Sequence, residues 1–383
     1  MDLKLLLRAF GLCLLVALTA IARPPNEYGF VDGALNPAVP LKLCLQNKNG
    51  KLLPTNSASD NRISLYIALE AGKIEKLNLE KNSTVWVSDL GGEIVSDVIY
   101  DDARVYFVTE VLKSSGGERE NQANRYILRA LDAETGLTIW QFPFLSSKPA
   151  SLSSYRDSLF LAETDGTIIS IRKINAQKKF EKNLNQQFSS PPFFFENRIY
   201  IATVKSLIYA LSTSDGEIVM KTAAAQTPAS ILAVAAGRLF WGDKKGSVYL
   251  LNIPRSSVSR QGRYGGEISS LTLTLDEILV TSLDNFVYFN RLRNSKNIWK
   301  RRLPGRILGK PLIIGDYVVF IIPAESEAII LNLKSGKIVN QIPLAEKDFF
   351  LSEPLVVNNL LTFFTNRGVI AFANTSNLNC LEN

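Results

Sequence analysis

Short runs of apolar residues recur along most of the chain and are separated by polar turns. Clear examples begin at Val105, Leu159, Ile199, Leu239, Ile278, Val318 and Leu360. After a first step of 54 residues, the runs begin 39–42 residues apart, and an earlier copy begins near Ile63. Each run is followed by a turn that commonly contains Gly or a small polar residue, and then by another apolar strand. The pattern therefore predicts a repeated unit of short strands.

A further turn closes each unit and is clearest at 130–140, which reads Ala-Leu-Asp-Ala-Glu-Thr-Gly-Leu-Thr-Ile-Trp. Copies of this motif recur at 210–220 and 331–339. A bulky residue occupies the same repeat position in most units, which predicts packing between neighbouring units: Trp86, Trp140, Phe180, Met220 and Trp299. Four short antiparallel strands in about forty residues are typical of a propeller blade, and a solenoid or a sandwich is the alternative array.

We predict an all-β fold, an eight-bladed β-propeller of four-stranded blades. Seven full blades are expected at 60–91, 92–146, 147–187, 188–228, 229–265, 266–305 and 306–348. Residues 349–375 hold a truncated unit without an outermost strand, and the strand-like segment 39–54 has no local partner. We expect residues 39–54 to complete the blade formed by 349–375, because an N-terminal strand there removes an open sheet edge. Residues 23–383 then form a single, monomeric propeller domain.

Residues 1–22 are typical of a signal peptide. Lys4 and Arg8 precede a fourteen-residue apolar run, which is shorter than the span of about twenty that a membrane requires, and 20–22 reads Ala-Ile-Ala. An uncleaved anchor helix is the alternative. The expected location is periplasmic or otherwise extracytoplasmic, where disulfides persist. Ring closure would bring Cys44 close to Cys380, so a disulfide between them is a hypothesis, with two free thiols as the alternative.

The composition narrows the chemistry. The chain contains no histidine, which removes the commonest general base and metal ligand. Cys44 and Cys380 are the only cysteines after the leader, too few for a tetrahedral thiolate zinc site. We therefore predict no catalytic residues, no metal site and no enzymatic activity. The net charge of +7 is interpreted as diffuse, which argues against nucleic acid and favours acidic partners or anionic surfaces, including peripheral membrane association.

Two segments are candidate partner contacts. The densest basic cluster joins Lys300, Arg301 and Arg302 to Arg306, with Arg291 and Arg293 nearby; it could meet an acidic partner or an anionic lipid headgroup. The second blade carries an insertion of about fourteen residues that includes Glu118, Arg119 and Glu120. The alternative for both segments is ordinary solvated surface.

The motif at 130–140 resembles the repeat of pyrroloquinoline-quinone-type propellers, and so do the prolines that begin the inner strands: Pro149, Pro192, Pro228, Pro311 and Pro354. The resemblance covers most of the chain after the leader. This group contains quinoprotein alcohol dehydrogenases and also non-catalytic eight-bladed proteins, such as the BamB-type subunit of the outer-membrane β-barrel assembly machinery.

The chain looks like the non-catalytic members. It is short for a quinoprotein dehydrogenase and has neither an adjacent cysteine pair nor an evident Glu-Asn-Asp calcium set. It departs from the BamB type because Cys13 follows the bulky Leu12 and is a poor lipid-attachment site. The resemblance implies an exported scaffold without a cofactor that mediates protein–protein interactions in the cell envelope, including outer-membrane protein assembly. The alternative is a quinone-cofactor or small-ligand propeller that uses its central funnel.

Overall fold

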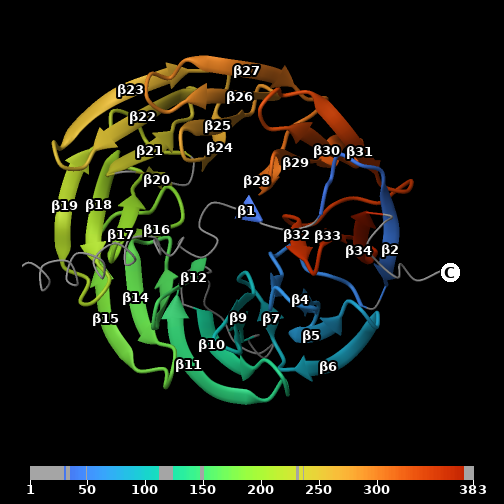
Figure 1. The fold of residues 1–383 in the computed structure, drawn as a ribbon. Helices are drawn as coiled ribbons and strands as arrows, with labels where there is room; N and C mark the ends of the chain where they lie inside the picture. Colours follow the sequence, from blue (N-terminus) through green and yellow to red (C-terminus); the bar gives the residue numbers. More distant parts are fainter. Residues whose placement is uncertain are drawn as a thin grey trace, which may run out of the picture.

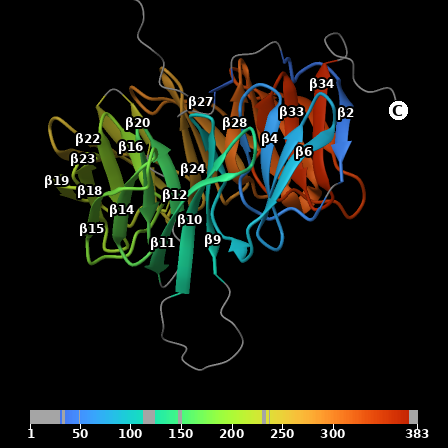
Figure 2. The same cartoon turned by 90° about the horizontal axis from the view of Figure 1, so that it is seen from below.

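The computed structural model describes residues 30–31, 35–48, 50–111, 124–146, 151–229, 233–235 and 237–374. Within these residues the strands form eight sheets arranged around a ring (Figure 1). The strands of each sheet run roughly along the axis of the ring (Figure 2). The predicted eight-bladed propeller is thus confirmed.

The first four blades follow one another along the chain. Blade 1 contains β3 (Ala58–Ser59), β4 (Ser64–Leu69), β5 (Lys73–Asn78) and β6 (Ser83–Asp89). Blade 2 contains β7 (Glu93–Ile94), β8 (Ile99–Asp101), β9 (Arg104–Glu110), β10 (Asn124–Asp132) and β11 (Thr138–Ser146). Blade 3 contains β12 (Ser151–Tyr155), β13 (Ser158–Ala162), β14 (Thr167–Arg172) and β15 (Lys178–Asn183). Blade 4 contains β16 (Phe193–Phe195), β17 (Arg198–Ala202), β18 (Leu207–Ser212) and β19 (Ile218–Ala223).

The remaining blades complete the ring. Blade 5 contains β20 (Ala233–Ala235), β21 (Arg238–Gly242), β22 (Ser247–Asn252) and β23 (Ser257–Arg263). Blade 6 contains β24 (Ile268–Leu273), β25 (Glu277–Ser282), β26 (Phe286–Arg291) and β27 (Asn297–Arg302). Blade 7 contains β28 (Leu308–Ile314), β29 (Tyr317–Ile322), the 3₁₀ helix η1 (Pro323–Glu325), β30 (Glu327–Asn332) and β31 (Ile338–Pro343). Blade 8 contains β32 (Leu355–Val357), β33 (Leu360–Thr365), β34 (Gly368–Asn374) and β2 (Leu41–Asn47).

The ring closes as predicted, through a strand from near the N-terminus. β2 pairs antiparallel with β34, from Leu41 opposite Asn374 to Asn47 opposite Val369. Beside this pairing, the Asn374 side chain accepts a hydrogen bond from the Asn36 backbone N–H (2.7 Å) and donates one to the Asn36 carbonyl (2.8 Å). Blade 8 is therefore built from both ends of the described chain.

One pairing has no counterpart in the sequence pattern. β1 (Phe30–Val31) pairs parallel with β28, with Phe30 opposite Ile313 and Val31 opposite Ile314. β28 is the innermost of the four antiparallel strands of its blade, and β1 lies toward the centre of the ring (Figure 1). The inner edge of blade 7 is thus covered by the chain itself.

The core lies between the faces of neighbouring blades. Every residue of β4, β13 and β33 is buried, because strands in the middle of a blade are covered on both faces. The outermost strands alternate instead; β6, for example, exposes Val85 and Val87 and partly buries Trp86. One core cluster joins Phe364 of blade 8 to Leu65 of blade 1, and another joins Trp299 of blade 6 to Phe320 of blade 7.

Candidate interaction surfaces

The bulky residue of each repeat docks on the following blade. The Trp86 indole N–H donates to the Ala133 carbonyl (3.3 Å), and Trp299 donates in the same way to Leu333 (2.8 Å). The turn that the indole ring contacts contains a glycine whose backbone has a left-handed conformation. A Cβ on Gly136 would lie 2.6 Å from Trp86, and one on Gly336 would lie 2.5 Å from Trp299. Trp and Gly of the repeat motif therefore form one contact, made between consecutive blades.

The other repeat positions lie at the same place in their blades. Trp140 donates its indole N–H to the Lys173 carbonyl (2.8 Å), and the Phe180 ring lies 2.6 Å from a Cβ built on Gly216. Met220 packs against the core cluster of blades 4 and 5. Each of the five residues stands at a register shift in the pairing of its outermost strand: Trp86, Trp140, Phe180, Met220 and Trp299.

A chain of hydrogen bonds runs from blade to blade at the start of the innermost strands. The Lys310 N–H of blade 7 donates to Glu353 of blade 8 (2.7 Å). The Glu353 N–H donates to Asn56 of blade 1 (3.3 Å), and the Asn56 N–H donates to Asp97 of blade 2 (2.9 Å). Sequence reasoning missed this network because its partners lie in different blades, although each acceptor stands at the same place, two residues before the innermost strand β32, β3 or β8.

Glu353 gives this network a dependence on pH. Burial raises the pKa of its carboxyl above the ordinary value of 4.5, against the hydrogen bond from Lys310. A raised folded-state pKa means that this group stabilises the fold most at acid pH, and that the contribution is lost as the pH rises through the folded-state pKa.

We expect Glu353→Gln to stabilise the protein at pH 8 and to have little effect at pH 4, because the amide oxygen can accept the same hydrogen bond without a charge. Thermal unfolding of both proteins across this range measures the difference. Glu217→Gln, at an exposed position, is the matched control and should show no such trend. An equal gain in thermal stability at pH 4 and pH 8 would contradict the role of the Glu353 charge.

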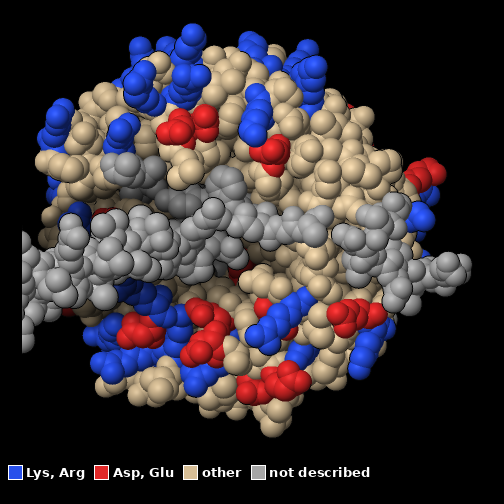
Figure 3. Space-filling model, viewed as in Figure 1, with Lys and Arg blue, Asp and Glu red and all other residues tan. Residues whose placement is uncertain are grey.

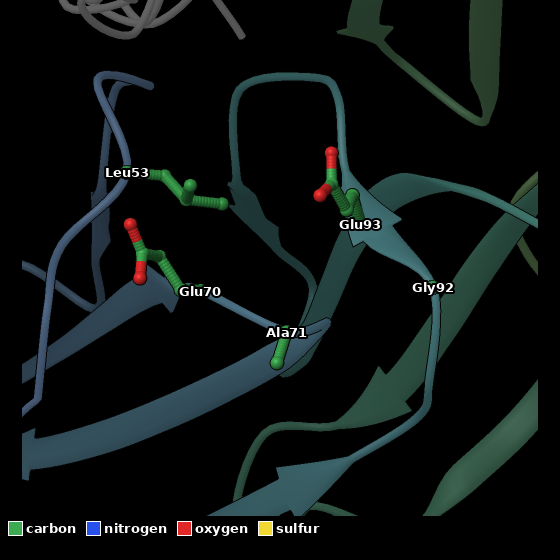
Figure 4. Close-up of a pocket in the computed structure, with 5 residues that line it drawn as sticks. All are labelled: Leu53, Glu70, Ala71, Gly92 and Glu93. Atoms are coloured by element: carbon green, nitrogen blue, oxygen red, sulfur yellow. The ribbon is translucent and has the colours of Figure 1, made fainter. Parts of the chain in front are cut away.

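A pocket of about 510 Å³ opens between blades 1 and 2 (Figure 4). Its lining consists of Leu53, Glu70, Ala71, Gly92 and Glu93. Leu53 points into it between the two carboxylates, and Lys51 pairs with Glu70 at its margin (2.5 Å). The volume lies within the range of sites that hold a small molecule or a partner's side chain.

The pocket depends on a glycine in its wall. Gly92 has φ of +78°, and a Cβ there would lie 2.1 Å from the Glu110 carbonyl oxygen of β9. Only a residue without a side chain can therefore bring this connector so close to blade 2.

The chain runs from the outer edge of blade 1 to the wall of this pocket. β6 is the outermost strand of its sheet and contains no proline, whereas β11 contains Pro143. Val85 and Val87 are 47% and 50% exposed, while Trp86 faces blade 2. After β6 the chain continues through Leu90 and Gly91 to Gly92 in the pocket wall. An unpaired edge with β-branched side chains is suited to receiving a strand from a partner.

The predicted basic cluster is divided by the structure. Lys300 and Arg302 are exposed on β27, whereas Arg301 is half-buried and donates from Nε to the Gly336 carbonyl (2.8 Å). Arg301 therefore helps to hold blade 7 against blade 6. Arg306 is exposed in the connector to β28.

Several predictions lie outside the described residues. These are the leader at 1–22, the insertion with Glu118, Arg119 and Glu120, and Cys380. Cys44 lies on β2 in the closing blade, and its pairing with Cys380 stays a prediction.

No group of three or more acidic or cysteine side chains in the described part of the chain is placed to hold a metal ion. The described residues also include no helix that is long and apolar enough to cross a membrane.

The ring of eight four-stranded blades places the chain in the class of eight-bladed β-propellers. A family model described as outer membrane protein assembly factor BamB matches residues 50–188 and 123–342. Because these matches cover more than half of the sequence, the chain belongs to this family, and the resemblance found in the repeat motif is confirmed. No curated protein matches the sequence significantly.

Solved structures share the fold. BamB from Moraxella catarrhalis has 18% identity and a TM-score of 0.64, covering 87% of this chain and 99% of its own. Sqt1 from Saccharomyces cerevisiae has 10% identity and a TM-score of 0.70, covering 88% and 99%. The computationally designed protein Ika8 has 11% identity and a TM-score of 0.70, covering 87% and 99%. At these identities the likeness concerns the fold alone.

Proposed function

We propose that this chain is a non-catalytic scaffold for protein–protein interactions in the cell envelope, and that it acts in the assembly of outer-membrane proteins. The observation that carries the proposal is the family match over residues 50–342, whose description names an assembly factor. The predicted leader at 1–22 supports an extracytoplasmic location. A rigid ring that holds its binding surfaces on short connectors fits a scaffold.

The surface best suited to a protein partner combines the edge of β6 with the pocket between blades 1 and 2. A partner strand on this edge would gain main-chain hydrogen bonds, and the exposed Val85 and Val87 would supply apolar contact. A side chain from the same partner would reach the pocket between Leu53 and Glu93. A cationic or amphipathic side chain fits there best, because Glu70 and Glu93 line the pocket.

Site-specific crosslinking in cells tests this function. We expect a photoreactive residue at Val87 to capture an envelope protein that takes part in outer-membrane assembly. The matched control is Val219 on β19, which is 52% exposed on another outermost strand and should capture no such protein. Val85→Lys with Val87→Lys should abolish the capture from a probe at Gly91, because charges on a strand edge oppose pairing.

Two results would contradict the proposal. One is a failure to capture any envelope protein from Val87 in the folded, exported chain. The other is equal capture from Val87 and Val219, which would show that the β6 edge has no preference.

A further inference from the structure

The basic excess of this protein is concentrated in two neighbouring blades. Residues 251–306 contain ten Lys and Arg and four Asp and Glu side chains, which gives a net charge of +6 out of +7 for the whole chain. The interpretation of the charge as diffuse is therefore wrong. Nine of the ten cations are exposed, and we call them the cationic rim: Arg255, Arg260, Arg263, Arg291, Arg293, Lys296, Lys300, Arg302 and Arg306.

The cationic rim lies on the outermost strands β23 and β27 and on the turns and connector next to them. Figure 3 shows blue side chains along the edge of the molecule where these strands lie. The two strands are outermost in their sheets, and the blades meet where the Ser295 hydroxyl donates to the Gln261 side chain (3.0 Å). The Lys300 ammonium lies over the rings of Phe286 (4.6 Å) and Tyr288 (5.9 Å) on the neighbouring strand β26 of the same blade. The cations thus form one surface.

These charges are not neutralised within the protein. Across the described residues, no member of the cationic rim forms an ion pair, although ion pairs occur elsewhere, such as Lys334 with Asp316 (3.0 Å). Two of the four acids in this segment are engaged by their own neighbours: Asp284 accepts from Tyr288 (2.8 Å) and Glu277 accepts from Thr274 (2.7 Å). Nine like charges on one convex edge repel one another and favour an anionic counterpart.

An exposed leucine, followed in the chain by Asp276 and Glu277, lies near one end of the cationic rim. Leu275 is 98% exposed, at the tip of the turn between β24 and β25. This turn adjoins the end of β26, because Glu277 pairs with Arg291 and the Leu292 N–H donates to the Asp276 carbonyl (2.8 Å). Apolar side chains beside lysines and arginines are typical of proteins that lie on a bilayer, where the apolar group enters the headgroup region and the cations meet phosphates.

We infer that the cationic rim and Leu275 form a docking surface for an anionic phospholipid membrane. A bilayer fits better than an acidic protein because the cations spread over two blades and the fully exposed Leu275 lies on the turn that adjoins Arg291. This surface would place blades 5 and 6 against the lipid. This placement is independent of the proposed partner surface at β6, which belongs to blade 1.

Vesicle co-sedimentation of the folded chain tests the inference. We expect binding to phosphatidylcholine vesicles that contain phosphatidylglycerol, no binding to phosphatidylcholine alone, and loss of binding at high salt. The variant carries four substitutions at exposed positions: Arg291→Glu, Arg293→Glu, Lys300→Glu and Arg302→Glu. It should bind on the order of a hundredfold more weakly, since each cation near an anionic surface contributes severalfold to the affinity.

A control with the same change of charge separates the rim from the net charge. It carries Lys42→Glu, Lys81→Glu, Arg172→Glu and Lys205→Glu, all at exposed positions on other blades. This control should keep most of its binding. Leu275→Ser, which changes no charge, should weaken binding severalfold at each salt concentration at which the unmodified protein binds. A variant with Gln in place of Glu at the four rim positions should bind vesicles with an affinity between those of the wild type and the Glu variant.

Three outcomes would overturn the inference. One is no sedimentation with phosphatidylglycerol vesicles, and another is an equal loss of binding in the rim variant and its control. The third is a rim variant that binds vesicles normally but loses a crosslinked protein partner, which would assign the cationic rim to an acidic protein instead.

Discussion

Replacing Trp299 by alanine should lower the free energy of unfolding by about 3–5 kcal/mol, among the largest effects of any single substitution in this protein. The indole is buried between blades 6 and 7, stacks on Phe289 with ring centroids 5.4 Å apart, and donates to the Leu333 carbonyl. Its removal leaves a cavity at a blade junction and takes the donor from a buried carbonyl. Equilibrium unfolding in denaturant measures the loss.

Two variants separate the causes of this effect. Trp299→Phe keeps an aromatic ring on Phe289 but loses the N–H, so it should cost about 1–3 kcal/mol. Leu275→Ala removes an exposed aliphatic side chain and should change stability by less than about 0.5 kcal/mol. A Trp299→Ala protein as stable as Leu275→Ala would show that the blades do not depend on this contact.

Replacing Gly368 by alanine should weaken the closure of the ring, at a cost of about 3 kcal/mol or more. Gly368 begins β34 with φ of +124°, and a Cβ there would lie 1.9 Å from the Asn47 carbonyl oxygen of β2. The methyl group can be accommodated only if β2 moves away. Hydrogen exchange should therefore accelerate first in the amides of β2 and β34.

Gly315→Ala is the matched control for this prediction. Gly315 also has a positive φ, of +55°, but a Cβ there would meet no atom within 4 Å. This variant should be destabilised only by the strained backbone, by about 1 kcal/mol, and hydrogen exchange in β2 should not change. Equal exchange of β2 in both variants would contradict the role of the close approach.

The sequence predicts this fold because its signals are local and repeated. Turn residues such as Gly136 and apolar runs such as Val105–Phe107 recur in most blades, so each copy reinforces the others. The closing strand is also predictable, since a unit without an outermost strand at 349–375 and a strand without a partner near Cys44 imply each other.

Other features depend on contacts that no short stretch of sequence contains. The bonds linking Lys310, Glu353, Asn56 and Asp97 join four different blades. Strand alternation places Arg301 on the same face of β27 as Trp299, but its acceptor, the Gly336 carbonyl, belongs to another blade. The cationic rim is only partly visible in the sequence: residues 291–306 stand out as a basic cluster, whereas their place beside Arg255, Arg260 and Arg263 follows from the neighbouring positions of blades 5 and 6 in the ring.

The closure of blade 8 also sets an order of events during synthesis. Asn36 and Asn374 flank the pairing of β2 with β34 and are 338 residues apart in the chain. At roughly 10 residues per second, β2 leaves the ribosome about half a minute before its partner. Blades 1 to 6 can each form from contiguous chain during that interval, whereas β2 must wait as an unpaired strand. A nascent or truncated chain that ends before residue 368 therefore cannot complete the ring, because β2 has no strand to pair with.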